Sequence, residues 1–137
     1  MPIPLQPQPD ALAASAPTAA ELGLMQGFPV PQDKRVTRDN FVIYPYSRWA
    51  FQNIRALQTT RGIFRGGDPV AAIAADPVDL DALTFTVANG RQVPLGTWFD
   101  ESGTDSFLVL HKGKLVYERY FNGMARSSLH QMFSVTK

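Results

Sequence analysis

Residues 105–121, DSFLVLHKGKLVYERYF, decide the fold expected for this chain. The apolar run at residues 107–110 is followed by a second β-prone run at residues 115–120. Gly113 lies between the two runs, where it can supply a left-handed turn conformation. The stretch therefore predicts a β-hairpin. Because apolar residues of the first strand are consecutive rather than alternating, we expect a sheet that is covered on both faces.

A second hairpin is predicted upstream, in residues 83–94. Leu83, Phe85 and Val87 alternate with threonines, and Asn89-Gly90 follows. This pair is typical of two-residue hairpin turns, because both residues tolerate positive φ. Pro94 has no N–H group, so the returning strand should be short or lie at an edge.

Helical patterns are expected earlier in the chain. Residues 47–58 place apolar side chains at helical spacing, and Ser47 is a suitable N-cap residue. Residues 68–81, between and around two prolines, predict one or two further helical turns. Residues 1–45, rich in proline and alanine at their start, are expected to form an extended N-terminal arm. Within this arm, Thr18 and Glu21 have the spacing of a capping box.

Composition narrows the function classes. The chain has 137 residues, 45% of them apolar, and a net charge of +1 without a basic run, so a nucleic-acid partner is not indicated. The absence of cysteine excludes disulfides, thiol nucleophiles and cysteine-ligated zinc, and the two histidines lack metal-binding spacing. Neither a basic leader nor a membrane-length apolar stretch is present, which favours a cytoplasmic protein without membrane association. We expect neither a metal nor an organic cofactor.

Ser134 and Lys137 form a Ser-x-x-Lys sequence at the end of the chain. A serine hydroxyl needs a base to become a nucleophile, and residues three apart share one face of a helix. A helix N-terminus and burial both lower the pKa of a lysine amine, so Lys137 could remove the serine proton. The Ser134 amide could then help to bind the oxyanion. The alternative interpretation is an accidental pair on a solvated tail.

Several other residues invite a functional interpretation, but a structural role is favoured for each. His111 is expected in an exposed turn, and His130, although four residues before Ser134, is expected to be structural. The remaining candidates are two tryptophans expected in the core, a lone glutamate, an aspartate pair expected in a solvated loop and a glycine pair without phosphate-loop context: Trp49, Trp98, Glu118, Asp79, Asp81, Gly66 and Gly67.

Residues 104–137 resemble the start of the serine β-lactamase-like hydrolases, a family that includes class C β-lactamases, DD-peptidases, esterases and 6-aminohexanoate-dimer hydrolases. The resemblance rests on the hairpin, the polar loop after it and the Phe133-Ser134-Val135-Thr136-Lys137 sequence, in the family's order. The helix pattern SRWAFQNIRAL at residues 47–57 is similar to the 6-aminohexanoate-dimer hydrolase branch.

The resemblance implies an α+β fold in which an antiparallel sheet has helices on both faces. Residues 46–137 would be the incomplete N-terminal part of that domain. Ser134 would be the acyl-forming nucleophile and Lys137 its general base, while the family's later tyrosine and second oxyanion strand are not found. We therefore expect an amide or ester hydrolase acting on small molecules, inactive without a C-terminal part that acts as its partner.

Within the family, a small-ester esterase and a β-lactamase are the alternatives. Two interpretations from other classes remain open. The chain could belong to a penicillin-recognising fold that binds ligands without turnover. It could also be a complete interaction module built on the hairpin, in which Ser-x-x-Lys is accidental.

Overall fold

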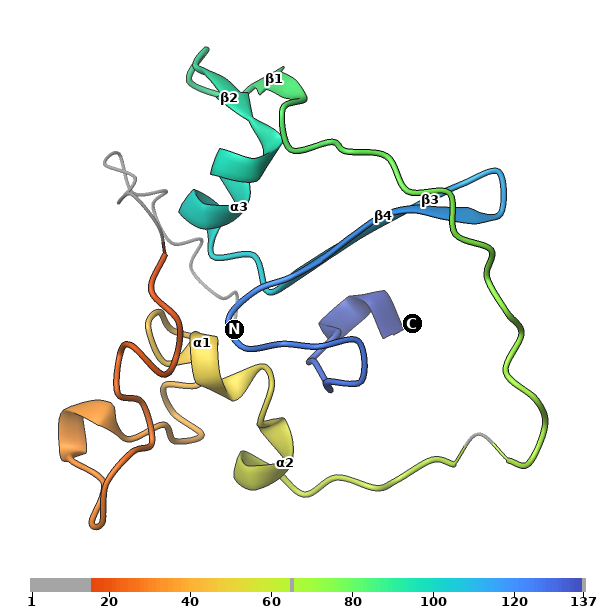
Figure 1. Cartoon of the computed structure of the whole chain (residues 1–137). Helices are drawn as coiled ribbons and strands as arrows, with labels where there is room; N and C mark the ends of the chain where they lie inside the picture. The colour runs from red at the N-terminus through yellow and green to blue at the C-terminus, as the bar shows by residue number, and fades with distance from the viewer. Residues whose placement is uncertain (1–15, 65, 137) are drawn as a thin grey trace.

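The computed structural model describes residues 16–64 and 66–136 and shows a mixed arrangement of short helices and antiparallel strands (Figure 1). In chain order, the elements are η1 (Gln32–Lys34), α1 (Ser47–Ala50), α2 (Ile54–Leu57), β1 (Thr84–Thr86), β2 (Gln92–Pro94), α3 (Leu95–Ser102), β3 (Ser106–His111), β4 (Lys114–Tyr120) and η2 (Phe133–Thr136). This content is consistent with the expected α+β class. The more specific β-lactamase-like topology stays a prediction.

The predicted hairpin at residues 105–121 is formed by β3 and β4, which pair antiparallel. His111 pairs with Lys114, and Lys112 and Gly113 between them both have positive φ, of 49° and 76°. Two successive residues with positive φ form the tight turn whose twist matches that of the flanking strands. The register shifts between Val109 and Leu110, which marks a bulge.

One face of this hairpin is packed and the other is open, so the expectation of a sheet covered on both faces is wrong for the described residues. Phe107 and Val109 of β3 pack against a cluster around Phe99 of α3. On the opposite face, Leu108 and Leu110 are 49% and 61% exposed. The consecutive apolar residues therefore serve one apolar face that is buried and one that is not.

An extended segment runs along β4, where one or two helical turns were expected. The Asp76 and Val78 amides donate to the carbonyls of Leu115 and Val116, at 3.0 and 2.7 Å. Pro77 lies between these two donors, so its missing N–H falls on the side that faces away from β4. The helix prediction for residues 68–81 is wrong, because the prolines fit an extended edge segment better than a helix interior.

The second hairpin pairs β1 with β2 around residues 87–91. The Val87 amide donates to the Arg91 carbonyl, and the Gly90 amide donates to the Val87 carbonyl. Gly90 has a φ of 85°, whereas Asn89 is not in the positive-φ region. The loop is therefore a three-residue turn closed by a left-handed glycine, not the predicted two-residue turn. Helix α3 follows directly after Pro94 and ends at Gly103, which has a φ of 65°.

The predicted helix at residues 47–58 is divided into α1 and α2. The Asn53 side chain donates to the Trp49 carbonyl at 2.8 Å, which takes the acceptor that the Asn53 amide would use in a continuous helix. Ser47 is not the N-cap, because its amide already donates to the Ile43 carbonyl in a turn that precedes α1.

Residues 16–45 form turns that pack on α1 instead of extending away from it. Leu24 and Val36, each 3% exposed, form a cluster with the fully buried Ala50. Thr18 and Glu21 make the reciprocal contacts of a capping box around a single turn, since the Glu21 amide donates to Thr18 Oγ1 and the Thr18 amide donates to the Glu21 carboxylate. Residues 1–15 lie outside the described residues, and the domain boundary at residue 46 stays a prediction.

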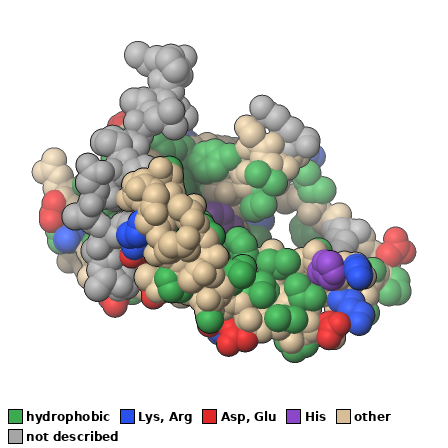
Figure 2. Space-filling view, turned by 90° about the horizontal axis from the view of Figure 1, so that it is seen from above, with side chains coloured by type: hydrophobic (Ala, Val, Ile, Leu, Met, Phe, Trp, Pro, Cys, Tyr) green, Lys and Arg blue, Asp and Glu red, His purple; other side chains and the backbone are tan. Residues whose placement is uncertain are grey.

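Apolar side chains remain exposed on much of the described surface. Figure 2 shows hydrophobic side chains edging a hollow in one face of the molecule. In Figure 1, the stretch between α2 and β1 runs as a wide arc without a helix. Within residues 16–64 and 66–136, no helix is long and apolar enough to cross a membrane.

Candidate active site

Ser134 lies in η2, a single 3₁₀ turn, and is exposed. The Val135 amide donates to the Met132 carbonyl at 3.1 Å within this turn. A helical turn at Ser134 was expected, and a tighter turn is found. Lys137 lies outside the described residues, so its distance from the Ser134 hydroxyl stays a prediction.

The residue before the serine has an uncommon backbone conformation. Phe133 has a φ of 46°, a region that bulky residues seldom adopt. Its ring meets the ring of Phe51, the residue that follows α1, edge to face at a centroid distance of 5.2 Å. The His130 ring also meets Phe51 edge to face, at 6.0 Å. The Gln131 amide donates to the Phe51 carbonyl at 2.7 Å. The segment that leads to Ser134 is thus seated on Phe51.

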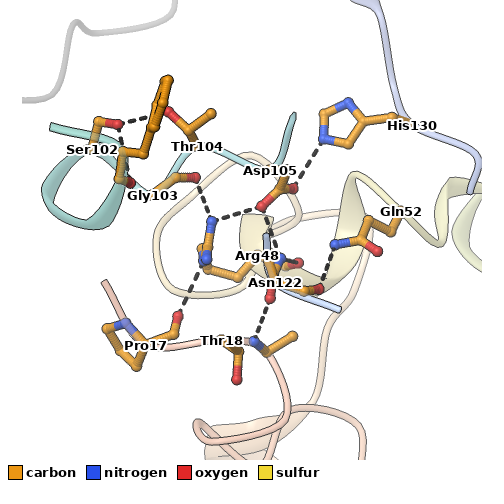
Figure 3. Close-up of polar contacts among 12 residues, drawn as sticks. Pro17, Thr18, Arg48, Gln52, Ser102, Gly103, Thr104, Asp105, Asn122 and His130 are labelled. Carbon is orange, nitrogen blue, oxygen red and sulfur yellow. Dashed lines mark hydrogen bonds and ion pairs between the residues drawn. The ribbon is translucent and has the colours of Figure 1, made fainter. Parts of the chain in front are cut away.

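A buried polar group lies beside this segment and centres on Asp105 (Figure 3). The Asp105 side chain, at the start of β3, is 9% exposed. Its Oδ1 accepts hydrogen bonds from Arg48 Nη1 at 2.7 Å and from Asn122 Nδ2 at 3.0 Å. Its Oδ2 lies 3.0 Å from Nε2 of His130. We call Arg48, Asp105, Asn122 and His130 the polar hub.

The hub joins segments that are far apart in sequence. Arg48 Nε donates to the Pro17 carbonyl at 3.1 Å, and Arg48 Nη1 also donates to the Gly103 carbonyl at the end of α3. The Asn122 side chain accepts from the Ala19 amide and donates to the Arg48 carbonyl, both at 2.7 Å. The N-terminal turns, α1, the end of α3 and both ends of the β3–β4 hairpin therefore meet at one point.

The hub was not predicted from the sequence as a unit. His130 was expected to be structural, and its contact with Asp105 agrees with that expectation. No pattern indicated Asp105 or Asn122, because each flanks a strand rather than belonging to a spaced motif. The one available signal was Arg48, a charged residue on the apolar side of the predicted helix, which is 6% exposed in the structure.

The other candidates take structural places. His111 is exposed at the end of β3, as expected. Trp49 and Trp98 are partly buried and pack against the two apolar clusters. Asp81 departs from its expectation: instead of lying in a solvated loop, it accepts a hydrogen bond from the Tyr117 hydroxyl and pairs with Arg119.

Tyr117 is the most buried residue of β4, and the pKa of its hydroxyl is raised, first by burial and then by its hydrogen bond to Asp81. Glu118 pairs with Arg126 and accepts from the Tyr120 hydroxyl, and these bonds lower the pKa of its carboxyl. Both groups belong to the hairpin and its following loop, away from the polar hub. Within the described residues, no three His, Cys, Asp or Glu side chains come together as a metal site.

An open pocket of about 440 Å³ lies next to the segment that leads to Ser134. It is lined by residues 51–56 and by Leu129 and His130. Phe51 and His130 therefore belong both to the pocket and to the seat of this segment.

Two comparisons with known proteins point in one direction. The chain is 35% identical over 102 residues to a 6-aminohexanoate-dimer hydrolase from Paenarthrobacter ureafaciens, a match that covers 74% of this chain and 24% of that protein. A solved structure from Bacillus anthracis, to which the same name is provisionally given, matches with a TM-score of 0.65 and 33% identity, covering 73% of this chain and 26% of the other. No model of a known protein family matches the chain. The chain thus spans about a quarter of the length of the relatives it matches.

Proposed function

We propose that this chain supplies the nucleophile and the general base of a serine hydrolase in the 6-aminohexanoate-dimer hydrolase family. The observation that carries the proposal is the similarity, at 35% identity, to a protein of that name. The exposed position of Ser134, directly after a segment seated on Phe51, agrees with it. The relatives are about four times as long as the matched part, so further catalytic groups would come from polypeptide outside these 137 residues.

The reaction would be acyl transfer in two steps. In the first step, the Lys137 amine, when uncharged, takes the Ser134 proton while Oγ attacks the substrate carbonyl. The carbon–nitrogen or carbon–oxygen bond then breaks, the leaving group takes up a proton, and an acyl ester remains on Ser134. In the second step, water attacks this ester and releases the carboxylic acid, which restores the serine hydroxyl.

Short amides of the aminohexanoate type are the first substrate class. The Paenarthrobacter relative is named for hydrolysis of the 6-aminohexanoate dimer, which contains one such amide bond. Small acyl esters come second, because the same acyl-enzyme forms from an ester with a better leaving group. β-Lactams come third. Cytoplasmic localisation stays a prediction.

The test uses a hybrid in which this chain replaces the aligned region of the Paenarthrobacter hydrolase, with residues 134–137 in place of that protein's own Ser-x-x-Lys sequence. A fluorescent serine-directed phosphonate should label the hybrid, and the hybrid should hydrolyse the 6-aminohexanoate dimer. Ser134→Ala should abolish both signals. Ser127→Ala, which changes an exposed serine in the preceding loop, should leave both unchanged.

Lys137→Met should abolish hydrolysis in the hybrid while its folded structure persists, because the serine would then lack its base. A folded hybrid that is not labelled, or one labelled equally with and without Ser134, would overturn the proposal. Substrate binding without labelling would instead favour the non-catalytic binding module.

A further inference from the structure

We infer that Asp105 and His130 are positioning residues that fix the direction of the Ser134 hydroxyl. The inference rests on the proposed function and assigns to the polar hub a part in catalysis that the Ser-x-x-Lys sequence does not reveal. Neither side chain is placed on the reacting atoms. Both act through the segment that carries the serine.

The first step is the accounting of the Asp105 carboxylate. A carboxylate that is 9% exposed is costly unless its oxygens are paired. Arg48 and Asn122 both donate to Oδ1. Oδ2 is left for His130, whose Nε2 must therefore carry the proton and donate. The His130 ring is held by the one oxygen of the hub that the rest of the chain leaves open.

The second step concerns what holds Ser134. Among the described residues, the segment 132–136 makes one internal backbone bond, from Val135 to Met132, and no hydrogen bond to the body of the chain. Met132 and Val135 are 52% and 77% exposed. The polar attachments nearest to the serine are consequently the His130 side chain and the Gln131 amide, which donates to the Phe51 carbonyl.

The third step separates positioning from direct catalysis. Nε2 of His130 faces Asp105, and Nδ1 lies 3.1 Å from the Gln131 carbonyl oxygen. Both ring nitrogens are thus engaged by oxygens other than the Ser134 hydroxyl. An aspartate–histidine pair four residues from a serine resembles a catalytic triad in composition, but here the pair faces the hub.

A matched pair of substitutions isolates the hydrogen bond to Asp105. His130→Gln keeps an N–H group close to the position of Nε2, whereas His130→Leu keeps comparable bulk and removes the donor. His111→Leu is the control, because it removes the exposed histidine at the end of β3. The variants are made both in the 137-residue chain and in the hybrid hydrolase.

The first readout is hydrogen exchange of the Gln131 amide in the 137-residue chain, which needs no catalysis. His130→Leu should speed this exchange about 10- to 100-fold, the effect of losing one charge-assisted hydrogen bond, while His130→Gln and His111→Leu should leave it unchanged. Asp105→Asn should also speed it. Equal exchange in His130→Leu and the unaltered chain would overturn the inference without bearing on the proposed function.

The second readout is the rate of phosphonate labelling in the hybrid at saturating and at low probe concentration. His130→Leu should lower the maximal labelling rate about 100-fold with little change in half-saturating concentration, because a displaced nucleophile loses reactivity rather than binding. His130→Gln should restore the rate. If Ser134→Ala abolishes labelling while His130→Leu labels like the unaltered hybrid, the proposed function stands and the positioning inference fails.

Discussion

Replacing Arg48 with methionine should destabilise the chain far more than removing a surface arginine. Methionine keeps most of the aliphatic length of arginine and deletes the guanidinium. The Arg48 and Asp105 side chains are 7% and 9% exposed, so the pair lies almost wholly out of water. The guanidinium also donates to the carbonyls of Pro17 and Gly103.

The magnitude follows from these contacts. Breaking a buried ion pair by removing one partner costs about 3–5 kcal/mol, because the other charge stays buried. Asp105 keeps Asn122 and His130, so we expect the lower end, about 3 kcal/mol for Arg48→Met. The exposed Arg91–Glu101 pair is the matched control, and Arg91→Met should cost only about 0.2–1 kcal/mol.

The assay is urea unfolding followed by tryptophan fluorescence. Trp49 reports on the cluster around α1, and Trp98 reports on the cluster around α3. A double-mutant cycle of Arg48→Met with Asp105→Leu isolates the pair, and its coupling energy should be about 1.5–3 kcal/mol. Loss of equal size in Arg48→Met and Arg91→Met, or additivity of the cycle to within about 0.5 kcal/mol, would refute the buried ion pair as the connection between the segments.

Three further outcomes are expected. Phe99→Ala should cost about 3–5 kcal/mol of unfolding free energy in urea, because Phe99 is 2% exposed at the centre of its cluster. Lys112→Asn should raise that free energy by about 0.5–1 kcal/mol, since asparagine tolerates the positive φ of 49° better than lysine. Arg126→Ala should raise the lowered pKa of Glu118, seen by NMR titration of the carboxyl carbon. Stability from Glu118 is present above its unfolded-state pKa and is lost as pH falls through its lower folded pKa, so Arg126→Ala should weaken this acid dependence.

The elements that the sequence predicts well are those set by local chemistry. The β3–β4 hairpin follows from two β-prone runs around Gly113, and the Thr18–Glu21 capping box follows from the spacing of its two side chains. Both features depend on residues within a few positions of one another. Ser134 was likewise found from spacing alone, although its pairing with Lys137 stays a prediction.

The features that escaped prediction depend on distant residues. The segment around Pro77 was expected to be helical, but its amides bond to β4 some forty residues later. The division between α1 and α2 depends on one side-chain bond of Asn53 that competes with the helix. The polar hub has no signature in any window of the chain, since Arg48 and Asn122 are 74 residues apart.

The hub also sets the order in which the chain can fold during synthesis. The turns near Ala19 are among the first described residues to be made, yet the Asn122 side chain that accepts the Ala19 amide is made 103 residues later. Until then, Arg48 has no buried partner and must remain hydrated. Contacts between such distant residues carry a large loop-closure entropy and form slowly. The emerging N-terminal half should therefore stay open to chaperones and proteases, and commit to its packed form only once His130 has been added.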